Sequence, residues 1–122
     1  MQPMIKVYLA DDSGEKFFGE GPYQLLKGIE KSGSLRASAA EMRMAYTKAL
    51  KIIKQAEKHL GYPLINRVTG GKCGGGSQIT IEGKKLIMQY EQYAEACRNA
   101  NRQIYQEIFE SEREKTSPDY RK

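Results

Sequence analysis

The sequence has no tryptophan, a single histidine (His59) and only two cysteines among its 122 residues. Cys73 and Cys97 are 24 residues apart and form no CxxC pair, so a zinc or haem site cannot be assembled from this spacing in one chain. We therefore predict no metal and no cofactor. Two isolated cysteines are also simpler to explain in a reducing compartment, and we expect a cytoplasmic protein.

Long apolar runs are missing as well. No stretch approaches the roughly 18 apolar residues that a transmembrane helix needs, and the start, "MQPMIKVYLADD", lacks a basic segment followed by an apolar one. These features predict neither secretion nor membrane insertion. One histidine and scattered acids offer no nucleophile with a base and no clustered carboxylates, so an enzyme is not expected.

Positive charge is present in excess and is concentrated in one segment. The chain carries a net charge of +5, yet residues 43–72 hold seven basic residues against Glu57 alone, a net +6. Residues 82–115 hold six basic and seven acidic residues, a net −1. A local excess of this kind is typical of a surface that binds an anionic partner such as nucleic acid.

The pattern of elements predicts an α+β fold that is mainly helical. Alternating apolar residues around an Asp-Asp-Ser-Gly turn predict an N-terminal hairpin over 4–19. Pro22 suits a first helical position, Ser34 can cap a short second helix, and a third helix over about 45–60 ends at Gly61. Two strands flanking a glycine loop over 64–81 and a long helix over 82–110 complete a winged helix-turn-helix domain over 1–110, with 111–122 as a flexible tail.

The third helix has two opposite faces. Ala49, Ile53 and Ala56 share an apolar arc, whereas the opposite arc carries Thr47 and three lysines that have almost no acidic neighbours. A solvated helix face is one interpretation. A recognition helix is the other, and the short capped helix before it favours that one. The residues predicted to contact DNA from this region are Arg43, Tyr46, Thr47, Lys48, Lys51, Lys54 and Lys58.

The loop "TGGKCGGGSQ" places five glycines and Lys72 within ten positions. It is not a phosphate-binding P-loop, because Cys73 follows the Gly-Lys pair and Asn66 stands five residues before Gly71. A hairpin tip without function remains open, but a wing lying along DNA would use both the glycine backbone and the cation. The wing residues predicted to contact DNA are Arg67, Thr69, Gly71, Lys72 and Gly74. The residue pattern gives Cys73 no role.

The run from "LLKGIEKSGSLRASAAEMRM" through "LINRVTGGKCGGGSQITIEGKKLI" resembles the N-terminal winged-helix domain of ModE-type molybdenum-dependent transcription regulators. The resemblance covers about residues 4–110, and "TGGK-x-GGG" is its most specific part. It implies a winged helix-turn-helix, a dimer formed through the long helix, and double-stranded DNA as partner. Arg43 stands where the family usually has glycine in the bend, Ala45 where it has a capping serine, and Cys73 where it has glycine.

The long helix carries seven-residue spacing that is typical of a helix seam. A helix that packs only on its own domain is the alternative interpretation. The residues predicted to form a homodimer interface are Leu86, Tyr90, Tyr93, Cys97 and Ile104. The sequence therefore predicts a homodimeric, sequence-specific DNA-binding transcriptional regulator. A winged-helix protein–protein adaptor and a binder of a small oxyanion such as molybdate are the alternatives.

Overall fold

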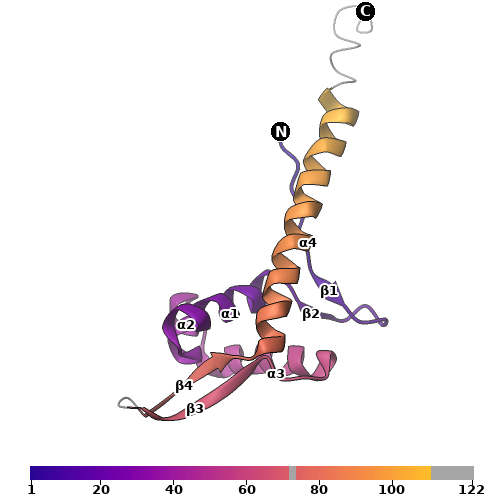
Figure 1. Cartoon of the computed structure of the whole chain (residues 1–122). Helices are drawn as coiled ribbons and strands as arrows, with labels where there is room; N and C mark the ends of the chain where they lie inside the picture. Colours follow the sequence, from indigo (N-terminus) through magenta and orange to yellow (C-terminus); the bar gives the residue numbers. More distant parts are fainter. Residues whose placement is uncertain (72–73, 111–122) are drawn as a thin grey trace, which may run out of the picture. The chain divides into compact units, whose positions relative to one another are not determined.

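The computed structural model describes residues 1–71 and 74–110, and for residues 69–71 and 74–75 it describes the backbone only. Lys72, Cys73 and the predicted tail over 111–122 lie outside this part of the chain. Two compact units are present, one formed by residues 8–90 and the other by residues 1–7 with the residues that follow 90. The helices and strands are labelled in Figure 1.

The first unit contains the helix-turn-helix and the wing. Its elements are β1 (Leu9–Ala10), β2 (Lys16–Phe18), α1 (Glu20–Ser32), α2 (Leu35–Glu41), α3 (Tyr46–Leu60), β3 (Ile65–Gly71), β4 (Gly74–Ile79) and the first turns of α4 (Ile81–Tyr105). The chain continues from α4 into a π-helical turn over Gln106–Glu110. Among the described residues, β1 and β2 form one antiparallel pair and β3 and β4 another. The predicted winged helix-turn-helix with a long C-terminal helix is confirmed.

Several predicted ends of helices are also confirmed. The Ser34 hydroxyl accepts a hydrogen bond from the Ala37 amide at 3.0 Å and so caps α2. Gly33 and Gly61 close α1 and α3 with φ angles of 74° and 83°, a conformation that glycine adopts without steric cost. Helix α1 begins at Glu20 rather than at Pro22, which places the proline within the first turn, where a missing amide hydrogen costs nothing.

The N-terminal hairpin is shorter than the predicted 4–19. Leu9 pairs with Phe18, and α1 starts two residues after Phe18. The chain therefore has no extended residues left to pair with positions 4–8. The apolar and polar residues alternate there, but without a partner strand they do not form one. The turn is fixed by Asp11, whose Oδ1 accepts hydrogen bonds from the Ser13 and Glu15 amides at 2.9 Å each.

The core of the first unit lies between the three short helices, the hairpin, the wing and the first turns of α4. Its largest fully buried side chains are Phe18, Leu25, Leu26, Ile29, Ile53 and Leu64. Helices α1 and α2 approach closely at Gly28, where an added Cβ would collide with Ser38 Oγ. The Ser38 hydroxyl instead donates to the Leu25 carbonyl at 2.8 Å, which satisfies it inside the core.

The wing is anchored to the helices through β4 and through the residue that follows it. The Gly33 carbonyl accepts from the Ser77 amide at 2.9 Å, and a Cβ on Gly76 would lie only 2.6 Å from that same oxygen. Directly after β4, the Thr80 hydroxyl donates to the Pro63 carbonyl at 2.8 Å and accepts from the Gly83 amide at 2.9 Å. Thr80 therefore joins the wing to the first turn of α4.

Candidate nucleic-acid interface

Helix α3 presents its cations to solvent. Ala49, Ile53 and Ala56 are fully buried, and this packing fixes the rotation of the helix about its axis. The residues on the predicted DNA-facing side that are exposed are Thr47, Lys48, Lys51, Lys54 and Lys58. The cations of the predicted row are therefore all exposed.

Glu57, the only acidic residue of this segment, is turned toward the wing. Its Oε2 accepts from the Leu64 amide at 2.7 Å and from the Ile65 amide at 3.4 Å, so it fixes the start of β3. Its Oε1 lies 3.6 Å from Lys54 Nζ, an ion pair whose lysine is largely exposed. The sequence suggested no role for Glu57, although a lone acid among seven cations could have prompted the search for a backbone partner.

Tyr46 is held by a residue that the sequence did not suggest. The Arg36 guanidinium of α2 lies 4.2 Å from the centre of the Tyr46 ring, a cation–π contact that couples the first turn of α3 to α2. Tyr46 is half-buried and Arg36 is exposed. Arg36 therefore joins the basic surface, and its guanidinium stacks over the Tyr46 ring.

The bend before α3 has an unusual backbone at Arg43. Its φ angle is 56°, and it is the only non-glycine residue with positive φ in the part of the chain that the structure describes. This left-handed conformation costs a side-chain-bearing residue roughly 1–2 kcal/mol. Arg43 is exposed and therefore adds a cation to the bend.

Replacing Arg43 by glycine should raise stability and lower affinity for DNA. Glycine removes the strain, although its larger chain entropy offsets about half of the gain, so we expect a rise of up to about 1 kcal/mol in the free energy of unfolding. Urea denaturation measures the first effect and a duplex titration the second. A variant that loses stability would show that the φ angle at this residue is not strained.

Helix α3 lacks a side-chain cap. Ala45 occupies the N-cap position, and no side-chain hydrogen bond closes the first turn. Because serine at this position can accept from an orphan amide, Ala45→Ser should stabilise the protein by about 1 kcal/mol, measured as a shift of the urea midpoint. Ala45→Val provides a control that cannot cap, and equal stability of the two variants would contradict the expectation.

The backbone of the wing forms an antiparallel hairpin whose register is regular from Ile65 to Thr69. Arg67 is exposed and pairs across the hairpin with Ser77, and Gly71 pairs with Gly74 after an irregularity in the register. Thr69 also lies in β3, where only its backbone is described. The predicted contact at Lys72 and the unexplained Cys73 lie outside the described residues.

The long helix divides the predicted dimer residues into two groups. Leu86 and Tyr90 are 6% and 4% exposed, and the Tyr90 ring packs against the rings of Phe18 and Tyr23 at 5.3 and 5.1 Å. Both side chains are buried by contacts within the single chain, so neither is available to contact a second copy. The heptad spacing could not distinguish an intrachain contact from an interchain one.

The other group lies on the part of α4 after residue 90. Tyr93 and Ile104 are 54% and 53% exposed, and Cys97 is half-buried. A hydrogen bond with the Cys97 side chain raises the pKa of Tyr93 above its usual range. Ile108 and Phe109 continue the exposed apolar surface toward the end of the described chain. A dimer surface over these residues stays a prediction.

Comparison with known proteins identifies relatives for part of the chain. The chain is 36% identical over 76 residues to the DNA-binding transcriptional dual regulator ModE of Escherichia coli, a match that covers 62% of this chain and 29% of the relative. It is 34% identical over 67 residues to the molybdenum transport protein ModE of Azotobacter vinelandii, covering 55% and 25%. The resemblance to ModE-type regulators is confirmed. The chain spans less than a third of the length of these relatives.

A solved structure supports the fold independently. ArgP from Mycobacterium tuberculosis superposes with a TM-score of 0.51 over 66% of this chain and 28% of its own, at 21% identity. No protein-family model matches the chain. Within the described residues, no helix has the length and apolar character needed to cross a bilayer.

Proposed function

We propose that this protein is a transcriptional regulator that binds double-stranded DNA in a sequence-specific manner. The observation that carries the proposal is the exposed row of lysines on α3, whose rotation is fixed by its buried face and whose one acidic neighbour is engaged by the wing. The names of the ModE relatives support a regulatory role. The proposal assigns no catalytic reaction, and it locates the protein with DNA in the cytoplasm.

In this proposal α3 enters the major groove. Thr47, Lys48 and Lys51 lie on its exposed face and reach base edges, with Tyr46 at its first turn. The cations proposed to contact phosphates are Arg36, Arg43, Lys54, Lys58, Arg67 and Lys72. The wing follows the flanking backbone, where the amides of Thr69, Gly71 and Gly74 can approach phosphates closely.

We further propose that two copies bind together through the exposed face of α4 after residue 90. The N-terminal residues Gln2 to Ile5 and the α4 residues Arg98, Asn101 and Arg102 line a shared depression, so this side of α4 is covered by the chain itself. Tyr93 and Ile104 lie about a quarter to half a turn away on an ideal helix and are exposed. Two-fold symmetry then predicts a roughly palindromic DNA site.

Selection of bound fragments from genomic DNA would test the proposal and define the site. We expect enrichment of a sequence with two related half-sites, and binding of that duplex with higher affinity than a scrambled duplex. Calorimetry with molybdate and with phosphate in the absence of DNA distinguishes a DNA-binding regulator from a binder of small oxyanions. Heat with an anion, and no enrichment of any duplex, would overturn the proposed function.

A further inference from the structure

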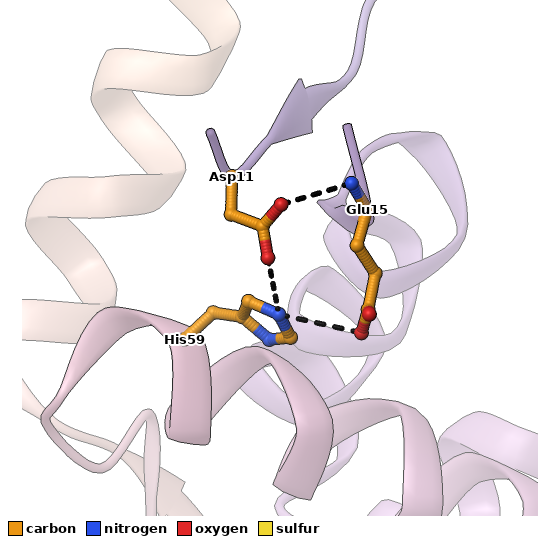
Figure 2. Close-up of side chains that lie close together, drawn as sticks. All are labelled: Asp11, Glu15 and His59. Carbon is orange, nitrogen blue, oxygen red and sulfur yellow. Dashed lines mark hydrogen bonds and ion pairs between the residues drawn. The ribbon is translucent and has the colours of Figure 1, made fainter. Parts of the chain in front are cut away.

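The β1–β2 turn and the end of α3 bring together two carboxylates and the only histidine. Figure 2 shows Asp11 and Glu15 converging on one edge of the His59 ring. His59 Nε2 lies 3.1 Å from Asp11 Oδ2 and 3.3 Å from Glu15 Oε1. One ligand atom from each of the three side chains lies within 4.8 Å of the others.

The hydrogen bond of Nδ1 determines the tautomer of His59, and so whether Nε2 carries a hydrogen or a lone pair. Nδ1 lies 3.0 Å from the Gln55 carbonyl oxygen, and because a carbonyl only accepts, Nδ1 carries a hydrogen. In neutral His59, Nε2 therefore directs a lone pair at two carboxylate oxygens. This arrangement is repulsive unless a proton or a metal cation lies between them.

The surroundings match those of a histidine that ligates a metal. Such histidines usually donate their second nitrogen to a carbonyl or a carboxylate, as His59 does to Gln55. Asp11 is also held in place, because its Oδ1 accepts from the Ser13 hydroxyl at 2.7 Å and from two backbone amides. Its Oδ2 is the oxygen that faces Nε2.

The distances also suit a small tetrahedral ion. Zinc binds nitrogen and carboxylate oxygen at about 2.0–2.2 Å, which places neighbouring ligand atoms of a tetrahedron about 3.3–3.6 Å apart. The observed 3.1 and 3.3 Å from Nε2 are close to this spacing, and the two carboxylate oxygens, within 4.8 Å of each other, would move toward the ion on binding. Glu15 is 52% exposed, so water can reach a fourth position.

We propose that Asp11, Glu15 and His59 bind a divalent transition-metal ion, with zinc as the occupant that the ligand set favours. A nitrogen with two carboxylates suits zinc better than magnesium or calcium, which prefer oxygen ligands alone. The bound ion would join the β1–β2 turn to the last turn of α3. The site is independent of the proposed function, since it shares no residue with the proposed DNA contacts.

The rival explanation is an imidazolium that bridges the two carboxylates without a metal. The hydrogen bond to the Gln55 carbonyl and then the charges of Glu15 and Asp11 raise the pKa of His59. The groups around the ring are Asp11, Glu15, the Gln55 carbonyl and the Phe17 ring, which stacks at 5.2 Å. Since metal and proton compete for Nε2, metal affinity must fall as pH drops through the pKa of His59.

Calorimetry with zinc chloride tests the site in the full chain without a histidine tag. Cys73→Ser and Cys97→Ser in the background remove the two thiols, which could bind zinc elsewhere. We expect one ion per chain, and a loss of affinity of more than about 10-fold in His59→Gln and in Asp11→Asn. Glu41→Gln, which neutralises an exposed carboxylate on α2, is the control and should bind like the parent.

Glu15→Gln changes the most exposed ligand and keeps the test informative if the His59 variant does not fold. Because the pKa of His59 is raised, affinity should also decrease as the pH falls from about pH 8 to about pH 6. Absence of heat in the parent, equal affinity in the ligand variants, or tighter binding of calcium than of zinc would overturn the proposal. The first of these results would favour the imidazolium bridge.

Discussion

Replacing Lys51 and Lys58 together by alanine should weaken binding to the selected duplex by roughly 10- to 100-fold at moderate salt. Both side chains are exposed on the same face of α3. Each phosphate contact that is lost reduces the number of counterions released on binding, and this weakens the affinity. Because both lysines point away from the core, the free energy of unfolding should stay close to that of the parent. Fluorescence anisotropy with a labelled duplex measures the effect.

A matched pair on α1 provides the control. Lys27 and Lys31 are also exposed, and Lys27 pairs with Glu30 at 3.4 Å. Replacing both by alanine lowers the net charge by the same amount and leaves α3 unchanged. If the two double variants lose affinity equally, the effect comes from overall charge, and α3 is not the DNA-contacting surface.

The second large effect is expected at the proposed dimer surface. Tyr93→Asp combined with Ile104→Asp places two carboxylates on an apolar surface that a second copy would bury, where unpaired charge is strongly unfavourable. The protein should sediment as a monomer, and affinity for a site with two half-sites should fall by about 100-fold or more, because linked binding of the two half-sites is lost. Binding to a single half-site should change little.

Gln92→Asp combined with Gln103→Asp adds the same two charges one position earlier on α4, where both residues are exposed. This variant should remain dimeric. Dissociation of both variants would attribute the effect to charge on the helix in general. A parent protein that sediments as a monomer at micromolar concentration, or a Tyr93 and Ile104 variant that remains dimeric, would contradict the proposed interface.

The elements of the first unit were predictable where local chemistry alone decides them. Ser34 caps α2, Gly61 ends α3, and the apolar period of α3 gave its buried face. The backbone of the bend before α3 was not evident from its sequence. Arg43 adopts the left-handed conformation that glycine favours, and glycine is the residue that the resemblance led us to expect at this position.

Contacts between distant segments were not predictable from periodicity. Tyr90 fits a heptad seam, yet its ring packs inside the chain against Phe18 and Tyr23. The sequence marked Glu57 only as the one acidic residue of 43–72, whereas its carboxylate accepts hydrogen bonds from the Leu64 and Ile65 amides at the start of the wing. His59 and Asp11 are 48 residues apart, so the absence of a CxxC pair, which argued against a metal, could not reveal their meeting.

The salt dependence of affinity tests the central claim most directly. The proposed phosphate contacts number about twelve in a dimer, which predicts that log K falls with log [salt] at a slope of about −11. They are Arg36, Arg43, Lys54, Lys58, Arg67 and Lys72 of each copy. Anisotropy titrations of the parent protein with the selected duplex, at salt concentrations from about 50 to about 200 mM, measure this slope. A steep linear decrease is the result we predict. An affinity that does not change over this range would contradict a DNA-binding surface built from α3 and the wing.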